Sequence, residues 1–522
     1  MRKLPACLSV EQIKLMNPLS RILQTIDLRF IAIALSCFFS LIVIANSPIP
    51  NDDAFSYLRA AEFFNEQGLN ATLVAYGWYW YSVLIACLNS ILPLGLMTTA
   101  HLLNMLSYAL LVYAFITLTM EYKATNTVKF FAAVVILAYP TINEMRYFLV
   151  RDFAYWAFCL TALIQLIRFN KTGNKVHALG WTLAMTAAIL FRLEGLILMA
   201  ATPFAFFMPG KHSIKERASL FITLLFFGLG VALITLVLFT LAGINLFEVF
   251  NFTYRWYLPL LAEYSGTLSG AADGAADGAN LSAKISDQVE IFTGKGLTIL
   301  FLGYLYSLIS TIFMTLGPPV CLFLVYGIYT RKITLQSESK WPCWFFLGST
   351  LLTLFIFLSI MQFLTSRYVV MPALLLLSLS PLILEILYKQ AQHNGRQELF
   401  RLAFRICVFY FAADSLVSFG YSKNYIKEAS NWARENIALE SAVQTNSFAV
   451  AYFSGLITEY DTINPDPADS LSSLELQDYL VLDLPHDDFN TQQALAQNSG
   501  LEELARFTNK RSDAIIIYRV QH

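Results

Sequence analysis

The sequence is short of charge. Asp, Glu, Lys and Arg make up only 14% of its 522 residues, whereas hydrophobic residues make up 57%. A soluble globular domain carries about 25% charged residues, so this composition excludes an ordinary soluble protein. The net charge of −1 says little about partners, because the two signs are segregated along the chain, and no nucleic-acid partner is expected.

Cysteine patterns and other ligand motifs are also lacking. The seven cysteines lie in the N-terminal tail or within apolar segments, and no Cys-x-x-Cys pair occurs. This argues against a disulfide framework and against a zinc site. No internal repeat and no cleavable signal peptide are recognisable, so the first apolar segment is expected to stay as an anchor. No metal site is expected; a divalent cation at the acidic residues discussed below is the only cofactor left open.

Uncharged apolar segments, in contrast, recur along the first 420 residues. Several reach the ~20 residues that cross the hydrocarbon core of a bilayer. They predict a mainly α-helical, multi-pass membrane domain over residues 1–420, with about 11 transmembrane helices. The expected crossings are 30–47, 99–120, 128–145, 153–169, 178–191, 195–209, 218–241, 304–330, 343–364, 368–388 and 403–420.

The distribution of positive charge predicts the topology. With these crossings, 20 of the 35 Lys and Arg residues fall in segments on the same side as the N-terminus. Cytoplasmic loops of membrane proteins carry the excess of Lys and Arg. We therefore expect an inner-membrane protein with its N-terminus in the cytoplasm. The loops 48–98 and 242–295 and the C-terminal residues 421–522 should then lie outside.

Three apolar stretches do not fit a simple crossing. Residues 77–96, rich in Trp and Tyr, read as an interfacial helix on the outer face, because a crossing there would turn the later basic loops outward. Residues 296–330 contain Pro318 and Pro319 and are interpreted as one crossing preceded by an outer helix. The short pair 178–191 and 195–209 is interpreted as a hairpin that bends at Gly195. The long loop 242–295 includes the low-complexity tract AADGAADGAN at 271–280, which is expected to be mobile.

From residue 421 onward charged residues become frequent. Residues 425–436 predict a helix, and the apolar runs at 442–445, 479–484, 501–507 and 514–520 predict strands. Residues 421–522 therefore predict a small α/β domain on the outer face. The run His486-Asp487-Asp488 favours a solvated turn over a metal site.

Acidic and basic residues gather at the predicted outer ends of the helices. Asp52 and Asp53 follow the first crossing, and three further clusters are predicted on the same face: Arg146 with Arg151 and Asp152, Arg192 with Glu194, and Arg367 with Tyr368. Ionisable residues at the rim of a helix bundle are usually paired, solvated or functional. Snorkelling to the interface explains any single residue, but convergence on one face favours a site. Arginines that bind phosphate, beside a carboxylate that acts as base, suit a phosphate-bearing substrate.

The order and spacing of several segments resemble one enzyme family. The segments are DDAFSYLRAAEFFNEQG at 52–68, the aromatic stretch followed by AHLLN at 100–104, Arg151-Asp152, TSRYVVMPAL at 365–374, YIKEASNWAREN at 425–436, VQTN at 443–446 and AYFSG at 451–455. Together they resemble the GT-C superfamily of polyprenyl-phosphate-dependent glycosyltransferases. The resemblance is to the bacterial branch with protein mannosyltransferases and the lipid A aminoarabinose transferase, and it covers nearly the whole chain.

The resemblance implies a fold, a reaction and roles for residues. It implies an inverting transfer of a sugar from a polyprenyl-phosphate carrier to a glycolipid, glycan or protein acceptor outside the membrane. Asp53 would be the base or acceptor-orienting group, because it precedes Tyr57 by the family's spacing of four, with Asp52 as the alternative. The remaining residues that the resemblance and the charge pattern single out are Asp152 as a second acidic residue, Arg367, Tyr368, Arg192 and Arg151 at the donor phosphate, and Glu194 beside Arg192. Relatives often carry a Lys-Pro pair before the interfacial helix, where this chain has Gly77-Trp78-Tyr79-Trp80.

Two other classes of function remain open at the level of sequence. A transporter or flippase for a lipid-linked or small solute would be expected to show internal repeats and broken helices near the bilayer midplane. A structural assembly subunit would need neither the acidic pair nor the arginines. The absence of a repeat and the gathering of charge on one face favour the transferase.

Overall fold

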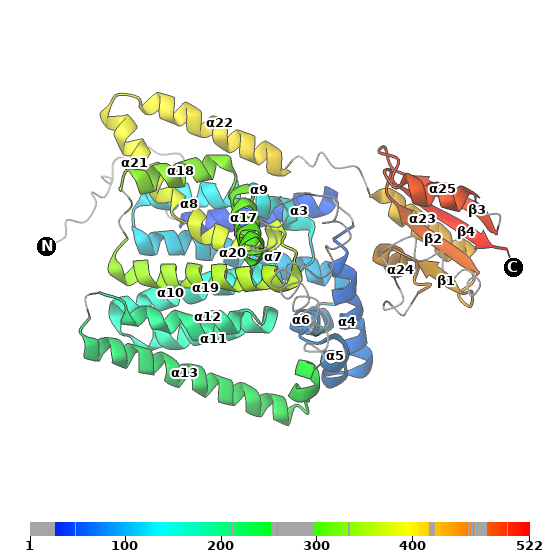
Figure 1. Cartoon of the computed structure of the whole chain (residues 1–522), viewed down its shortest axis with the longest axis horizontal. Helices are drawn as coiled ribbons and strands as arrows, with labels where there is room; N and C mark the ends of the chain where they lie inside the picture. The colour runs from blue at the N-terminus through cyan, green and yellow to red at the C-terminus, as the bar shows by residue number, and fades with distance from the viewer. Residues whose placement is uncertain are drawn as a thin grey trace, which may run out of the picture.

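The computed structural model of the chain describes residues 27–46, 49–210, 212–251, 258, 296–331, 333, 335–416, 423–457, 460, 463, 478–497 and 500–521. Figure 1 shows a bundle of long helices and, beside one of its ends, a small sheet with its own helices. This confirms the predicted class, a mainly α-helical chain with a small C-terminal α/β unit. The tract at 271–280 and the proposed boundary between residues 420 and 421 lie outside the described residues.

Seven helices in the described part of the chain are long and apolar enough to cross a membrane. They are α3 (Leu28–Asn46), α7 (Leu96–Tyr122), α10 (Asp152–Thr172), α13 (Ile214–Leu241), α17 (Gly296–Leu316), α19 (Ser337–Met361) and α20 (Ser366–Leu377) continued by α21 (Ser380–His393). An eighth candidate is α8 (Asn126–Leu137), bent by 45° into α9 (Pro140–Glu144) and η1 (Met145–Tyr147). The predicted number of about 11 crossings stays a prediction.

The helix α10 lies at the centre of the bundle. In its most apolar stretch 78% of residues are buried, against 11% in α13 and 17% in α3. The outer helix α13 exposes Phe226, Leu229 and Leu233 and runs along one margin of the bundle in Figure 1. A helix that shows large apolar side chains outward over its whole length suits a hydrocarbon environment.

Two expected crossings take a different local form. The stretch 304–330 is divided at Gly317, whose φ of +81° is followed by Pro318 and Pro319, so that α17 ends at Leu316 and α18 (Pro318–Tyr329) begins anew. Two consecutive prolines cannot continue a helix but start one well. After α11 (Lys175–Phe191) the stretch 195–209 forms α12 (Gly195–Ala201) and then the 3-10 helix η2 (Thr202–Phe207), because Pro203 withdraws a backbone donor.

A layer of short helices lies at one end of the bundle. It consists of α4 (Asp53–Gln67), α5 (Leu69–Tyr76) and α6 (Trp80–Ile91), and Figure 1 shows α4 and α5 running across the direction of the long helices. The 12-residue α6 is about 18 Å long and too short to span a bilayer. That it lies in the interface on the outer face stays a prediction. One face of α4 is buried through Ala54, Phe55, Leu58 and Ala61, and this fixes the N-terminus of α4, with its aspartates, on the bundle.

The C-terminal part follows the sequence prediction closely. After α22 (Gln397–Leu416) come α23 (Asn424–Asn436), β1 (Val443–Thr445), α24 (Phe448–Ser454), β2 (Tyr479–Leu484), α25 (Phe489–Gln497), β3 (Leu501–Thr508) and β4 (Ala514–Val520). The sheet order is β1-β2-β4-β3, with β1 parallel to β2 and the other pairs antiparallel. Alternate residues of β2 and β4 face α23 on one side and α25 on the other. Burial on both faces explains why these strands read as continuous apolar runs.

The sheet unit contacts the bundle through α4. The ring of Phe55 lies 5.5 Å from that of Tyr452 and 5.8 Å from that of Phe453, both on α24. Ile49 and Phe55 belong to the same buried cluster as Ile426, Val481 and Ile515 of the sheet unit. The α/β unit is therefore held at the end of the bundle that carries Asp52 and Asp53.

Candidate active site

The site begins where α4 begins. The side chain of Asn51 accepts a hydrogen bond of 2.9 Å from the backbone N–H of Leu149, which ties the start of α4 to the segment before α10. Asp53 follows as the first residue of the helix, with 48% of its side chain exposed. A carboxylate in the first turn is favoured by the helix dipole. Asp53 is thus accessible to solvent, and the helix that carries it is anchored to the bundle.

Asp152 occupies the equivalent position at the N-terminus of α10 but is buried, with a side chain only 3% exposed. Its Oδ1 accepts a hydrogen bond from Nη1 of Arg192, in the turn between α11 and α12. The Nη2 atom of Arg192 lies 2.6 Å from Oε1 of Glu194. One arginine therefore joins the two carboxylates, and the buried charge of Asp152 is neutralised where it lies.

Arg367 connects this buried pair to Asp53. It lies in the first turn of α20; its Nη1 is 2.5 Å from Oδ2 of Asp53 and its Nε is 3.9 Å from Oδ2 of Asp152. The ring of Tyr368 lies beneath both arginines, 5.2 Å from the guanidinium carbon of Arg192 and 5.4 Å from that of Arg367. An aromatic face at this distance stabilises a cation and keeps the two guanidinium groups in place.

Arg151 and Tyr57 complete the inner wall. Nη1 of Arg151 donates a 3.2 Å hydrogen bond to the backbone oxygen of Trp78. The ring of Tyr57 lies 5.1 Å from each of Tyr79 and Tyr81. Burial raises the pKa of Tyr57 above its ordinary value, so its hydroxyl stays protonated and remains a hydrogen-bond donor.

The electrostatics of the cluster are balanced. Burial alone would raise the pKa of the Glu194 carboxyl, but Arg192 and Arg151 hold it below its ordinary value. Arg151, Arg192 and Arg367 thus stand against three carboxylates, those of Asp53, Asp152 and Glu194. The donor set does not suit a divalent cation, because each carboxylate already faces an arginine, and among the described residues no group of three or more His, Cys, Asp or Glu side chains is placed to hold a metal ion.

Asp52 stands apart from this cluster. It is exposed, and its side chain makes no hydrogen bond or ion pair with another described residue. Its charge acts instead on Asp483 of β2, whose pKa is raised to about 6 by burial and then by the neighbouring carboxylates of Asp52 and Asp513. The structure thus separates the two adjacent aspartates: Asp53 faces the arginines and Asp52 the α/β unit.

Arg146, which the sequence groups with Arg151 and Asp152, belongs to a different network. It is 1% exposed and donates to the Ser36 backbone oxygen at 2.9 Å, to the Ser40 hydroxyl at 2.7 Å and to Asn143 at 2.8 Å. Its guanidinium also lies 4.7 Å from the ring of Tyr108. Arg146 therefore fastens η1 to α3 and α7 and does not reach the cluster of carboxylates.

Supporting residues also emerge that sequence reasoning did not assign a role. Asn104 of α7 accepts a 2.8 Å hydrogen bond from the Tyr81 hydroxyl and donates one of 2.7 Å to the Phe148 backbone oxygen, which fixes α6 against the segment before α10. The ring of Tyr155, three residues after Asp152, lies 5.8 Å from the guanidinium carbon of Arg192. Its spacing from Asp152 on one helix face was the available signal. A cavity of about 40 Å³ lies beside these groups, between Tyr155, Arg192, Glu194 and Tyr368.

No family model and no curated protein sequence matches the chain, but several solved structures are similar in overall arrangement. The oligosaccharyltransferase of Archaeoglobus fulgidus is 12% identical, with 93% of this chain and 74% of that chain covered and a TM-score of 0.47. ArnT of Cupriavidus metallidurans is 12% identical, with 94% and 97% covered and a TM-score of 0.43, and was also solved bound to undecaprenyl phosphate. The mycobacterial arabinofuranosyltransferase AftD is 14% identical, with 95% of this chain but only 41% of that chain covered and a TM-score of 0.43. At these values the assignment of an activity rests on the chain's own residues.

Proposed function

We propose that the chain is a GT-C glycosyltransferase that moves a sugar from a polyprenyl-phosphate donor to an acceptor hydroxyl. The observation that carries the proposal is the pairing of Asp53 with Arg367 across more than 300 residues of chain, with Asp152 and Arg192 behind them. A phosphate leaving group requires arginines that are held in a fixed orientation. A hydroxyl nucleophile requires an accessible carboxylate that can take its proton. The resemblance of residues 52–68 and 365–374 to the family's segments supports the same assignment.

In the proposed reaction the donor phosphate takes the place of Asp53 on Arg367. Arg367 can make this exchange because Asp53 is half-exposed, whereas Asp152 is buried and keeps Arg192 and Arg367 oriented. The released Asp53 carboxylate then accepts the proton of the acceptor hydroxyl. The hydroxyl oxygen forms the new bond to the sugar carbon as the carbon–oxygen bond to phosphate breaks, and the electron pair leaves with the polyprenyl phosphate. Attack from the side opposite the phosphate inverts the sugar carbon.

The protein's contribution in this scheme is position and charge. Phosphate is already a good leaving group, so fixed arginines that meet its developing charge supply the main stabilisation. Tyr57 lines the inner wall of the site, Tyr368 packs against the two arginines, and Glu194 keeps Arg192 in place. No step needs a metal ion. The acceptor is a glycolipid, glycan or protein hydroxyl presented beside α4.

The proposed placement in the membrane follows the charge of the loops. Residues 1–420 would form the catalytic transmembrane domain of an inner-membrane protein, with the N-terminus in the cytoplasm. Residues 421–522 would form an extracytoplasmic domain that covers the acceptor side of the site. This orientation puts Asp53 on the face where lipid-linked sugars are used.

The test is sugar transfer by the purified full-length protein from a synthetic polyprenyl-phosphate sugar to an acceptor extract of the cell envelope. Arg367→Ala should raise the apparent KM for the donor by roughly 10- to 150-fold, since a charge-assisted contact contributes about 1.5–3 kcal/mol. Arg59→Ala is the matched control, because within the described part of the chain Arg59 of α4 pairs with Glu62 and Glu66 and not with the residues of the site. A folded Arg367→Ala protein with an unchanged donor KM would remove this arginine from the phosphate site. The absence of any transfer by wild-type protein would favour a transporter of lipid-linked solutes.

A further inference from the structure

The end of the bundle opposite Asp53 holds a second, strongly basic cavity. Asp152 begins α10, and Arg168 lies 16 residues further along the same helix, which places the two about 24 Å apart along its axis. Around Arg168 a cavity of about 440 Å³ is lined by Arg29, Lys123, Arg168, Lys171, Glu121 and Gln336, among others. These residues come from α3, from α10, from the C-terminal end of α7 and from the segment before α19. The cavity is thus assembled from distant parts of the sequence.

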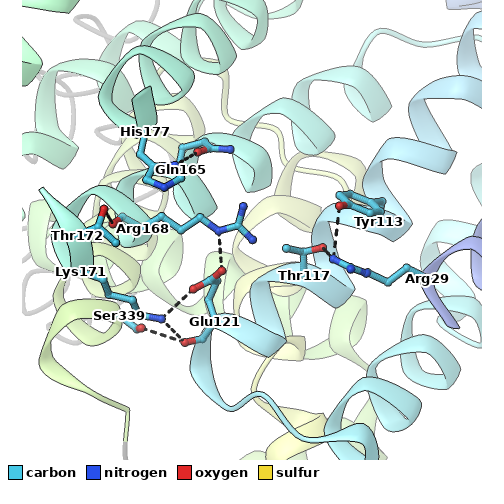
Figure 2. A network of polar contacts seen from close by, with 10 residues as sticks. All are labelled: Arg29, Tyr113, Thr117, Glu121, Gln165, Arg168, Lys171, Thr172, His177 and Ser339. Carbon is cyan, nitrogen blue, oxygen red and sulfur yellow. Dashed lines mark hydrogen bonds and ion pairs between the residues drawn. The ribbon is translucent and has the colours of Figure 1, made fainter. Parts of the chain in front are cut away.

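Among the described residues that line the cavity, Glu121 is the only carboxylate, and both of its oxygens are already paired with cations. Its Oε1 lies 2.7 Å from Nε of Arg168, and its Oε2 lies 2.8 Å from Nζ of Lys171 (Figure 2). Lys171 also donates a 2.7 Å hydrogen bond to the Glu121 backbone oxygen. Glu121 therefore holds two cations in place but neutralises only one positive charge.

The same sharing recurs at the neighbouring carboxylates. Asp27 pairs with Arg29 at 2.6 Å and with Lys129 at 3.3 Å. Glu385 pairs with Lys123 at 2.6 Å and with Lys389 at 2.9 Å. Among the described residues, six cations thus share these three carboxylates, and four of the six, Arg29, Lys123, Arg168 and Lys171, line the cavity. Positive charge is therefore in surplus at the described part of its wall. The cluster around Asp53, in contrast, is balanced.

Some of the hydrogen-bond donors in the cavity wall are free to bind an anion. Figure 2 shows the terminal nitrogens of Arg168 pointing away from the α10 backbone toward Thr117, with Arg29 arriving from the other side. Within the described part of the chain Arg168 makes its hydrogen bond through Nε, and neither Nη atom has a partner. Arg29 uses Nη1 for the hydroxyls of Tyr113 and Thr117, at 3.4 and 3.3 Å. An arginine whose Nη pair is unused presents the fork that binds a phosphate oxygen pair.

We propose that this cavity binds the phosphate group of an anionic membrane lipid or free inorganic phosphate. Basic pockets between transmembrane helices on the cytoplasmic side take lipid phosphates, and a volume of about 440 Å³ is within the range of small-ligand pockets. The proposal does not depend on the transferase activity, because it concerns residues at the other end of the bundle. The occupant would bridge α3, α10 and the α7 end and so stabilise the folded protein.

The experiment measures thermal unfolding of delipidated full-length protein in neutral detergent during titration with phosphatidylglycerol, with phosphatidylcholine, or with inorganic phosphate. Arg168→Gln should weaken the apparent affinity for the stabilising ligand by about tenfold or more. Lys123→Gln should act in the same direction, and it leaves Glu385 with Lys389 and Thr125, so it can be tested even where Arg168→Gln does not fold. The matched control is Arg401→Gln, a half-exposed arginine of α22 paired with Glu398 away from the cavity.

Each outcome decides the proposal. Stabilisation by phosphatidylglycerol but not phosphatidylcholine, lost in the two cavity variants and kept in Arg401→Gln, identifies a lipid phosphate. Stabilisation by inorganic phosphate with the same pattern of variants identifies free phosphate. If the cavity variants respond like wild type, or if Arg401→Gln loses the response to the same extent, the cavity is not an anion site and the proposal is overturned.

Discussion

At the scale of residues, the site depends on the different surroundings of two adjacent carboxylates. The side chain of Asp53 is paired with Arg367, whereas the side chain of Asp52 makes no hydrogen bond or ion pair with a described residue and faces the α/β unit. The sequence alone ranks Asp53 first by its spacing to Tyr57. The contact with Arg367 could not be predicted from the sequence, because it depends on how α4 and α20 pack.

This difference yields a prediction. Asp53→Asn preserves the size of the side chain but removes the base, so turnover should fall by at least about 10²-fold, the low end for general acid–base catalysis. Donor binding should persist, because Arg192 and Arg367 remain. Asp52→Asn is the matched control and should cost far less. Steady-state kinetics of the two purified variants check this, and near-normal turnover by Asp53→Asn would remove the residue from the mechanism.

At the scale of elements, the turn between α11 and α12 positions Arg192 and Glu194. A Cβ atom at Gly195 would lie 3.0 Å from Cγ1 and 3.2 Å from the backbone nitrogen of Ile189. A Cβ atom here would be closer to its neighbours than most Cβ atoms in proteins are, so Ile189 would have to shift by a few tenths of an ångström. The close approach at Gly195 directs the turn toward Asp152.

Gly195→Ala should accordingly destabilise the protein by about 1–3 kcal/mol, as overpacking does, although alanine favours a helix. Gly230→Ala in α13 is the control, because no heavy atom lies within 4 Å of its added Cβ. Thermal unfolding in detergent should place Gly195→Ala several degrees below Gly230→Ala. Equal melting temperatures would show that the turn tolerates the methyl group.

The strand β2 carries a second testable feature. The pKa of Asp483 is raised to about 6 by burial, with further contributions from the charges of Asp52 and Asp513, and Tyr425 lies 3.3 Å from its Oδ1. A carboxyl whose pKa is higher in the folded than in the unfolded state binds more protons when folded. Its contribution to stability is therefore full below the ordinary aspartate pKa of 3.8 and is lost as the pH rises through about 6.

Asp483→Asn should remove this pH dependence, because asparagine resembles the protonated carboxyl. We expect the wild-type protein to lose about 1–3 kcal/mol of stability between pH 4 and pH 7 relative to the variant. Melting temperatures measured at both pH values for wild type, Asp483→Asn and the exposed control Glu428→Gln test this. An identical pH profile for wild type and Asp483→Asn would refute the assignment.

The elements also show what sequence can and cannot predict. The strands β2 and β4 were predicted within a residue, because burial on both faces leaves unbroken apolar runs. The stretches 195–209 and 304–330 were predicted as single crossings, but each is divided into two helical segments. Hydropathy measures the length of an apolar stretch and does not show the helix breaks near Pro203 and at Gly317. The outer residues were predicted to share one face from topology alone. The side chains with which they pair could not be predicted. Asp152, Arg192 and Arg367 meet only because α10, the turn before α12 and α20 pack together.

At the scale of the whole molecule, the two ends of the bundle differ in charge. The end with Asp53 is balanced, and the other end carries surplus cations around Arg168. That asymmetry predicts an orientation, which impermeant thiol labelling in intact cells can test. In a background without the seven native cysteines, single cysteines replacing Glu66 or Glu435 should be labelled, and those replacing Lys175 or Lys215 should be labelled only after the membrane is opened. The reverse pattern would place the candidate active site in the cytoplasm.

The buried Arg146 has a consequence for the biogenesis of the protein. Its partners Ser36 and Ser40 lie on α3, which is synthesised about a hundred residues before the arginine itself. A serine side chain in the membrane interior costs little free energy, whereas an arginine without hydrogen-bond acceptors there costs much more. Helix α3 therefore has to stay beside the insertion site until the bent segment of α8, α9 and η1 is inserted. In this sense α3 is an assembly partner of the later helices before it becomes part of the folded bundle.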